Sequence, residues 1–211
     1  MCIADTMNPA EIDISTVAIC TKVPHLEQGT NNDNTKQTQT LAMICEQYPP
    51  EAWTSVYTDG SATNVIQDSG AGTGIVIYLP SGSTEVASTA TQRHRSNYKT
   101  YSEALIMAIS LAVDSQQKSN MAVFLTDALS VLQALTNNKL PHLAKDLQLL
   151  SNTCRMAFQW IHAKCGVRGN EQTYTLAKQG AETEQPVANV SYQEKAIITK
   201  VLMMPSQEKE A

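Results

Sequence analysis

Two aspartates that each follow a β-prone segment are the residues of this sequence best placed to do chemistry. Asp59 follows residues 53–58, and Asp127 follows the apolar stretch 121–125 and a threonine. Two carboxylates at adjacent strand ends suit Mg²⁺, a hard cation that takes oxygen ligands and keeps waters for phosphate chemistry. Two simpler alternatives stand beside this. Asp59 can belong to an Asp-Gly hairpin turn, and Asp127 can cap the next helix.

The hydrophobic pattern predicts the elements that must position these two aspartates. Short β-prone runs separated by turn residues predict strands, and apolar residues at intervals of three to four predict helices. The predicted elements are strands at 53–59, 70–79 and 84–90, a helix at 100–116, a strand at 121–125, helices at 128–135 and 140–156, a strand at 158–161 and a helix at 170–181, which Asn170 caps. This order predicts an α/β domain with a mixed five-stranded sheet, in which the strands leading to Asp59 and Asp127 are neighbours.

The overall composition favours a single intracellular domain. The 211 residues are 42% apolar, enough for one core, and we expect a monomer. The net charge of −5 offers no long-range attraction for phosphate backbones, so nucleic-acid binding needs a local basic or metal-bearing patch. The five cysteines are scattered without metal-binding spacing and are expected to be reduced thiols. No apolar run approaches the roughly 20 residues that span a bilayer, so no membrane insertion is expected. A nuclear or a cytoplasmic site stays open.

Three segments are expected along the chain. Residues 1–52 are predicted to be a flexible leader, because the polar run at 28–39 cannot bury enough surface to offset its ordering entropy. Residues 53–182 are predicted to form the folded domain. Residues 183–211 are expected to be a tail in which 191–204 has the apolar spacing of a short helix.

Four motifs occur in order along the predicted domain. They are YTDGSA at 57–62, SNYK at 96–99, LTDALSVLQAL at 125–135, and a segment at 160–178 that runs from WI through CGVRGNE to LAK. Together they resemble the ribonuclease H type 1 family, and in particular the ribonuclease H domain of non-LTR retrotransposon polyproteins. The resemblance spans about residues 53–182 and implies the ribonuclease H fold. It also implies cleavage of the RNA strand of RNA–DNA hybrids by two Mg²⁺ ions, which four carboxylates hold in the order Asp, Glu, Asp, Asp.

Only two of the four carboxylates carry over to this sequence. Asp59 matches the first aspartate and Asp127 the third ligand, which makes both of them metal and catalytic candidates. The glutamate position falls on Tyr101, and Glu103 comes two residues late. Helical spacing agrees, because residue 101 lies on the stripe that faces the sheet while residue 103 is rotated by about 200° from it. Glu103 also fits a capping box with Thr100 and is a weak catalytic candidate.

The C-terminal part of the resemblance departs from the family in two further places. Tyr174 stands where the family has its fourth carboxylate, an aspartate. The family's mobile-loop histidine falls on Lys164, and His162, two residues upstream, is a weak candidate to replace it. The expected contacts to the hybrid substrate are Gly60, Ser61, Asn97 and Lys164.

Two hypotheses about function follow from this incomplete set. In the first, the domain is a slow nuclease in which Asp59 and Asp127 bind one Mg²⁺, and Glu103 or His162 partly compensates for the missing ligands. In the second, it is a catalytically dead remnant that binds nucleic acid or a partner, or has no selected function. A phenol with a pKa of about 10 is neutral at pH 7 and does not offset metal charge, so two-metal binding should be much weaker. A tethering module is a third hypothesis, and the few basic residues support it poorly.

Overall fold

The structure is a computed structural model, and part of the chain is described in it. The described residues are 17–24, 26, 32–62, 70–93, 95–114, 120–140, 143, 147, 148 and 150–186. The expected C-terminal helix at 191–204 and the first 16 residues lie outside this range. Within it, no helix is both long and apolar enough to cross a membrane.

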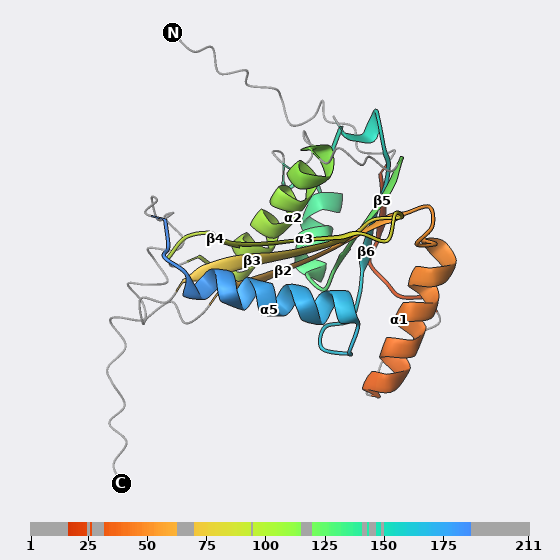
Figure 1. The fold of residues 1–211 in the computed structure, drawn as a ribbon, viewed down its shortest axis with the longest axis horizontal. Helices are drawn as coiled ribbons and strands as arrows, with labels where there is room; N and C mark the ends of the chain where they lie inside the picture. Colours follow the sequence, from red (N-terminus) through yellow and green to blue (C-terminus); the bar gives the residue numbers. More distant parts are fainter. Residues whose placement is uncertain are drawn as a thin grey trace.

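A mixed six-stranded sheet forms the centre of the domain (Figure 1). Its spatial order is β1-β6-β5-β2-β3-β4. Strands β2, β3 and β4 form an antiparallel meander, whereas β1, β6 and β5 run parallel to β2. The strands are β1 (Ala18–Cys20), β2 (Thr54–Ala62), β3 (Ala71–Tyr78), β4 (Thr84–Ala90), β5 (Met121–Thr126) and β6 (Arg155–Trp160). The predicted mixed α/β architecture is confirmed, with one strand more than expected.

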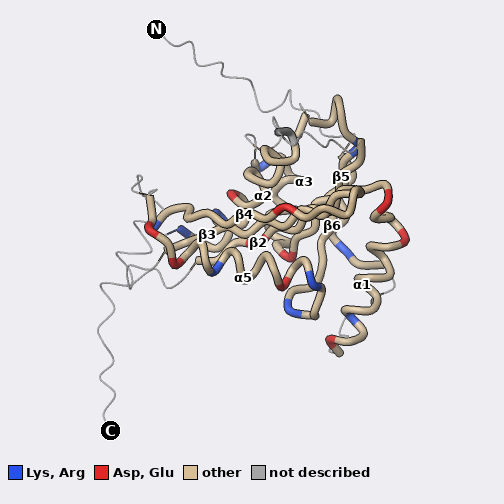
Figure 2. Tube along the Cα trace, in the orientation of Figure 1, with Lys and Arg blue, Asp and Glu red and all other residues tan. Residues whose placement is uncertain are grey.

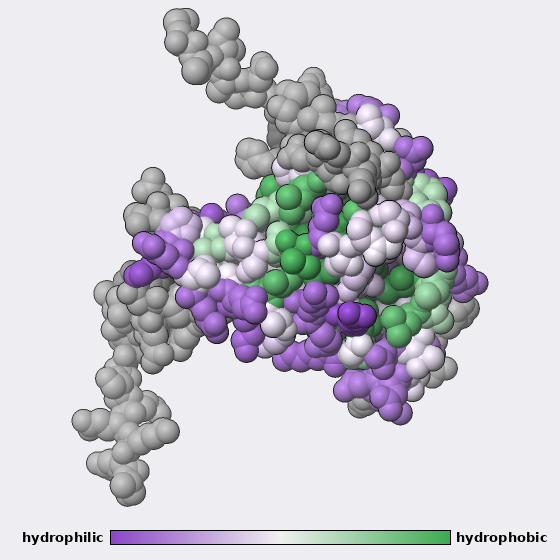
Figure 3. Space-filling view, in the orientation of Figure 1, coloured by the Kyte–Doolittle hydropathy of each residue, from purple (hydrophilic) through white to green (hydrophobic). Residues whose placement is uncertain are grey.

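Helices cover both faces of the sheet. Helices α2 (Asn97–Asp114) and α3 (Leu129–Thr136) pack on one face, and α1 (Asp33–Gln47) and α5 (Arg168–Glu182) on the other. Strand β5 supplies both cores, because its alternate side chains point in opposite directions. Phe124 stacks on Phe158 beneath α2 and α3, while Val123 and Leu125 join the cluster beneath α1 and α5. Polar residues cover the outer side of α5, and apolar residues gather over α2 and α3 (Figure 3).

The predicted flexible leader is wrong for much of residues 17–52. Three of these residues form β1, which pairs with β6 through Ala18 and Ala157, and fifteen form α1. Helix α1 begins where the side chain of Asn32 accepts hydrogen bonds from the next backbone amides. Met43 and Ile44 are buried against the sheet. Packing of these few apolar residues outweighs the weak helix propensity of the polar segment that surrounds them.

Glycines on β3 allow α5 to lie unusually close to the sheet. A Cβ atom added to Gly74 would overlap the carbonyl oxygen of Thr173, and one added to Gly72 would overlap the backbone near Gly180. The Ser88 hydroxyl on β4 also donates a hydrogen bond of 2.7 Å to the carbonyl of Leu176. This close packing fixes the position of α5 over the sheet.

We expect Gly74→Ala to destabilise the domain by about 3 kcal/mol, because the new methyl group must displace helix backbone rather than a flexible side chain. Urea unfolding measures this loss. Gly82→Asn is the control, since a Cβ at Gly82 meets no atom within 4 Å and asparagine tolerates the positive φ of this turn. A loss below about 1 kcal/mol for Gly74→Ala would contradict the close packing.

Candidate active site

The register of the sheet brings the two predicted aspartates together. Strands β2 and β5 are parallel neighbours, and their last paired residues are Thr58 and Thr126. Asp59 and Asp127 each follow this pair by one residue, so both carboxylates line one pocket. The expected neighbouring strands are confirmed.

Asp59 does not end its strand, contrary to the sequence prediction. Strand β2 continues through Ala62, and Asp59 pairs with Gly74 on β3. The hairpin-turn alternative for Asp59 is therefore wrong. Gly60 serves packing instead, because a Cβ atom there would lie 2.6 Å from the backbone nitrogen of Tyr101. The Gly60 amide donates a 2.7 Å hydrogen bond to the Asp59 carboxylate.

Asp127 does not cap α3 either. The cap residue of this helix is Ala128, and no side chain makes a cap hydrogen bond there. The Thr126 hydroxyl accepts a hydrogen bond from the Ala128 amide at 3.2 Å, which leaves the Asp127 carboxylate directed to the pocket. The backbone carbonyl of Asp127 accepts a hydrogen bond from the Trp160 indole at 3.1 Å. These two hydrogen bonds fix the backbone from which the Asp127 side chain extends.

Helix α2 carries Tyr101 into the pocket. The helix begins at Asn97, where the Ser96 hydroxyl accepts a hydrogen bond from the Lys99 amide at 3.4 Å. The expected capping box around Thr100 and Glu103 is thus wrong, because the helix starts three residues earlier. Tyr101 lines the pocket together with both aspartates. Glu103 is half-buried and does not line the pocket.

Helix α5 contributes three further side chains to the pocket. It begins at Arg168, so Asn170 lies inside the helix rather than at its cap. Asn170 is only 3% exposed, and its amide donates a 3.5 Å hydrogen bond to Asp127. Glu171 lines the pocket beside it, and Tyr174 lies one turn further along, with its ring near the ammonium of Lys178. Asn170 and Glu171 are the functional candidates that the sequence analysis did not select, although both stand in the motif that it quoted.

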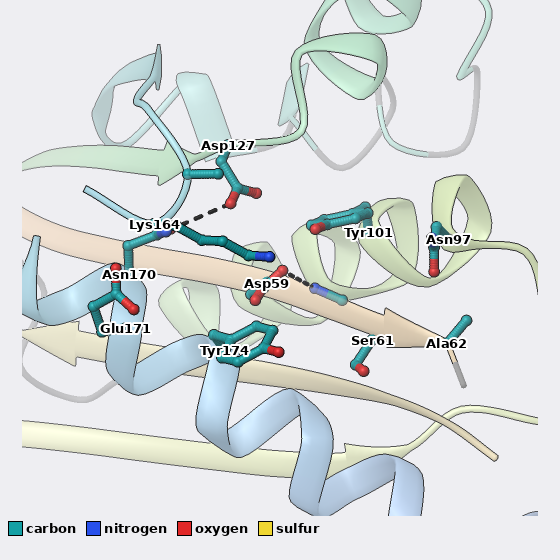
Figure 4. A pocket seen from close by; sticks show the side chains of 12 residues that line it. Asp59, Ser61, Ala62, Asn97, Tyr101, Asp127, Lys164, Asn170, Glu171 and Tyr174 are labelled. Carbon is teal, nitrogen blue, oxygen red and sulfur yellow. Dashed lines mark hydrogen bonds between the residues drawn. The ribbon is translucent and has the colours of Figure 1, made fainter. Parts of the chain in front are cut away.

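The loop of residues 161–167, here called the pocket loop, brings Lys164 to the site. Lys164 adopts a positive φ of 53°, and its side chain extends into the pocket toward Asp59 (Figure 4). His162 does not line the pocket. Its ring contacts Trp160 at 4.4 Å between centroids, and burial together with the nearby charge of Lys36 lowers the pKa of His162.

These elements enclose a pocket of about 250 Å³. It contains all four expected substrate contacts, Gly60, Ser61, Asn97 and Lys164, along with both aspartates and both tyrosines. Figure 4 shows Tyr101 and Tyr174 on opposite sides of Asp59, on α2 and α5. Over the part of the chain that Figure 2 colours, basic residues are scattered among acidic ones rather than gathered in one segment. Any nucleic-acid contact therefore depends on local groups such as Lys164.

Burial shapes the protonation of the site. Asp59 is 2% exposed, and its burial together with the Asp127 charge raises its pKa to about 7, against the opposing effect of nearby donors such as the Gly60 amide. Burial also raises the pKa of Asp127, although the Asn170 amide counteracts it. Burial and the two nearby carboxylates raise the pKa of Tyr101, so its phenol stays protonated.

The donor set offers two aspartate carboxylates to a magnesium ion. The Asp127 Oδ1 atom is buried and has no hydrogen-bond partner, which leaves it free to accept a cation. Asp59 supplies a second hard oxygen ligand, and water can complete the octahedral shell that Mg²⁺ needs. Among the described residues no group of three or more His, Cys, Asp or Glu side chains could hold a metal ion.

A family model and several solved structures match the chain. The RNase H family model matches residues 51–182. The chain is similar to the solved structure of RNase H1 from Halobacterium salinarum NRC-1, with a TM-score of 0.48 and 18% identity over 61% of this chain and 96% of that one. It is similar to the N-terminal RNase H domain of a Mycobacterium tuberculosis protein fused to maltose-binding protein, with a TM-score of 0.49 and 20% identity over 62% of this chain and 94% of that one. It is also similar to LC11-RNase H1 in complex with an RNA/DNA hybrid, with a TM-score of 0.45 and 17% identity over 60% of this chain and 97% of that one.

No curated protein matches the chain. The family match covers well over half of the sequence and includes every residue of the pocket. The chain therefore belongs to the RNase H family. The finer resemblance to retrotransposon domains stays a prediction.

Proposed function

We propose that this protein is an RNA–DNA hybrid ribonuclease of impaired activity, which binds the hybrid at the pocket and hydrolyses its RNA strand slowly. One observation carries the proposal. The side chain of Tyr101 lines the pocket beside Asp59 and Asp127, at the position where the family resemblance implies a glutamate ligand.

Tyr101 weakens cation binding because it is neutral. The glutamate that the family resemblance implies at this position would carry a negative charge, whereas the phenol of Tyr101 remains protonated. Tyr101 therefore supplies neither the charge nor the carboxylate oxygen that would hold a metal. A cation must also compete with the protonation of Asp59, which has a pKa of about 7.

Asp59 and Asp127 are the residues that would hold a magnesium ion here. A magnesium ion bound there would activate water and stabilise charge on the phosphate. Asn170 orients Asp127 through its hydrogen bond, and the Gly60 amide orients Asp59. Lys164 would attract the phosphate of the RNA strand beside the two carboxylates, and Ser61 and Asn97 would contact the substrate at the other end of the pocket.

Cleavage of a labelled RNA–DNA hybrid tests this function. We expect slow, Mg²⁺- or Mn²⁺-dependent cleavage of the RNA strand of the hybrid and none of double-stranded DNA. Asp59→Asn should abolish this turnover, because it removes a metal ligand without changing the side-chain shape. Hybrid binding without any turnover in either metal would instead support the second hypothesis, a catalytically dead hybrid-binding domain.

Salt dependence tests the binding role of Lys164. Lys164→Ala should weaken hybrid binding and reduce the slope of log affinity against log salt by about 1, because one phosphate contact is lost. Fluorescence anisotropy at several salt concentrations measures this slope. Lys139→Ala removes the same charge from an exposed position beyond α3 and should leave the slope unchanged. Equal slopes for the wild type and Lys164→Ala would exclude the proposed phosphate contact.

A further inference from the structure

Two elements that precede the family match pack against the domain. Strand β1 and helix α1 end before residue 51, where the RNase H match begins. Strand β1 extends the sheet beside β6, and α1 lies on the same face as α5 (Figure 1). The buried side chain of Gln159 on β6 makes hydrogen bonds to the residues just after both elements. It donates to the Lys22 carbonyl, after β1, at 2.9 Å and accepts from the Tyr48 hydroxyl, after α1, at 3.3 Å.

Helix α1 also contacts the pocket loop directly. The side-chain amide of Gln37 donates a 2.6 Å hydrogen bond to the carbonyl of Gly166. Gly166 has a φ of +81°, and a Cβ atom there would lie 2.8 Å from the Gln37 amide nitrogen. Both the positive φ and the close approach of Gln37 therefore require a glycine at residue 166. Gln37 contacts the backbone of the loop rather than a side chain.

The same stretch of the loop is tied to the pocket from the other side. The Gly166 amide donates a 3.2 Å hydrogen bond to the carboxylate of Glu171, which lines the pocket. Lys164, two residues earlier, has its own positive φ and extends into the pocket. Cys165, between them, is buried beneath α1 in the cluster that contains Met43 and Ile44. The conformation that directs Lys164 inward is thus held between α1 and α5.

We propose that β1 and α1 are an integral support of the site, and that Gln37 is a positioning residue that holds the pocket loop so that Lys164 reaches the substrate. This inference rests on the proposed function for the role of Lys164, whereas the support of the loop by Gln37 stands on the structure alone. The tests separate these two parts.

Hydrogen exchange measures the support of the loop without any substrate. In the full chain, Gln37→Ala should speed exchange of the Gly166 amide about fivefold or more, because the loop loses the hydrogen bond that closes it on the α1 side. Gln47→Ala is the matched control, since it changes the same residue type at an exposed position of the same helix and should leave the Gly166 amide unaffected. Equal exchange of this amide in the two variants would overturn the inference.

A double-mutant cycle on hybrid binding tests the action through Lys164. Gln37→Ala alone should weaken binding about fivefold. In the Lys164→Ala background it should have almost no further effect, because the side chain that it positions is gone. Additive losses would overturn the positioning role, since a general structural defect adds to any other. If the wild type fails to bind the hybrid, the proposed function and the Lys164 role both fail, and the exchange experiment still decides the support of the loop.

Discussion

Tyr101→Glu should raise the rate of RNA-strand cleavage by about 100-fold or more in saturating Mg²⁺. The substitution places a carboxylate beside Asp59 and Asp127 in place of a neutral phenol. The added negative charge favours binding of the cation, and the new carboxylate supplies a further oxygen ligand. Steady-state cleavage of a labelled hybrid, measured across a Mg²⁺ titration, gives both the rate and the apparent metal affinity.

Two variants control for other effects of this substitution. Tyr98→Glu adds the same charge one turn earlier on α2, at a residue that is 38% exposed and does not line the pocket, and it should not raise the rate. Tyr101→Phe removes the hydroxyl without adding a ligand and should give a much smaller gain. A folded Tyr101→Glu protein with wild-type turnover and wild-type Mg²⁺ affinity would show that Tyr101 is not what limits the site.

Asp59→Asn should stabilise the protein at pH 8, on the order of 2–4 kcal/mol in the free energy of unfolding when no divalent metal is present. The folded-state pKa of Asp59 is about 7, and its ordinary value is 3.8. Between pH 3.8 and about pH 7, the Asp59 carboxyl is mostly protonated in the folded state and mostly ionised in the unfolded state. The free energy of unfolding therefore falls as pH rises from about 4 to about 7 and levels off above that. Asparagine removes this cost because it does not ionise.

Urea unfolding at several pH values tests the sign of this prediction. The advantage of Asp59→Asn should be large at pH 8 and small at pH 4, because pH 4 lies well below the folded-state pKa of Asp59 and close to its ordinary value of 3.8. Asp33→Asn is the control for loss of a carboxylate charge, because Asp33 is exposed and pairs with Lys36 far from the pocket. Added Mg²⁺ should stabilise the wild type at pH 8 and leave Asp59→Asn unchanged. If the gain in the free energy of unfolding from Asp59→Asn is the same at pH 4 and pH 8, the folded-state pKa of Asp59 is not raised and the prediction is wrong.

The sheet and its two aspartates could be predicted from the sequence because their signals are local. Alternation and continuous apolar runs identify strands, and the order of strands and helices makes β2 and β5 neighbours. The helical period then places residue 101, rather than residue 103, on the face toward the sheet. These arguments need only the spacing of residues within one element.

The features that the sequence analysis missed depend on contacts between distant segments. Helix α1 is mostly polar, and only its packing against β6 and the pocket loop explains why it forms. The hydrogen bond from Asn170 to Asp127 joins residues 43 positions apart, so no local pattern indicates it. Gly60 suggested a turn because Asp-Gly is a common turn pair, whereas the close approach of α2 is what requires a glycine there.

One side-by-side measurement tests the central claim, that the Asp59 and Asp127 pocket is an RNase H site weakened by Tyr101. It is the rate of Mg²⁺-dependent cleavage of one labelled RNA–DNA hybrid by the wild type, Asp59→Asn and Tyr101→Glu. We predict slow cleavage by the wild type, none by Asp59→Asn and a rate about 100-fold higher for Tyr101→Glu. Cleavage that persists unchanged in Asp59→Asn would contradict the account, because the reaction would then not occur at this pocket.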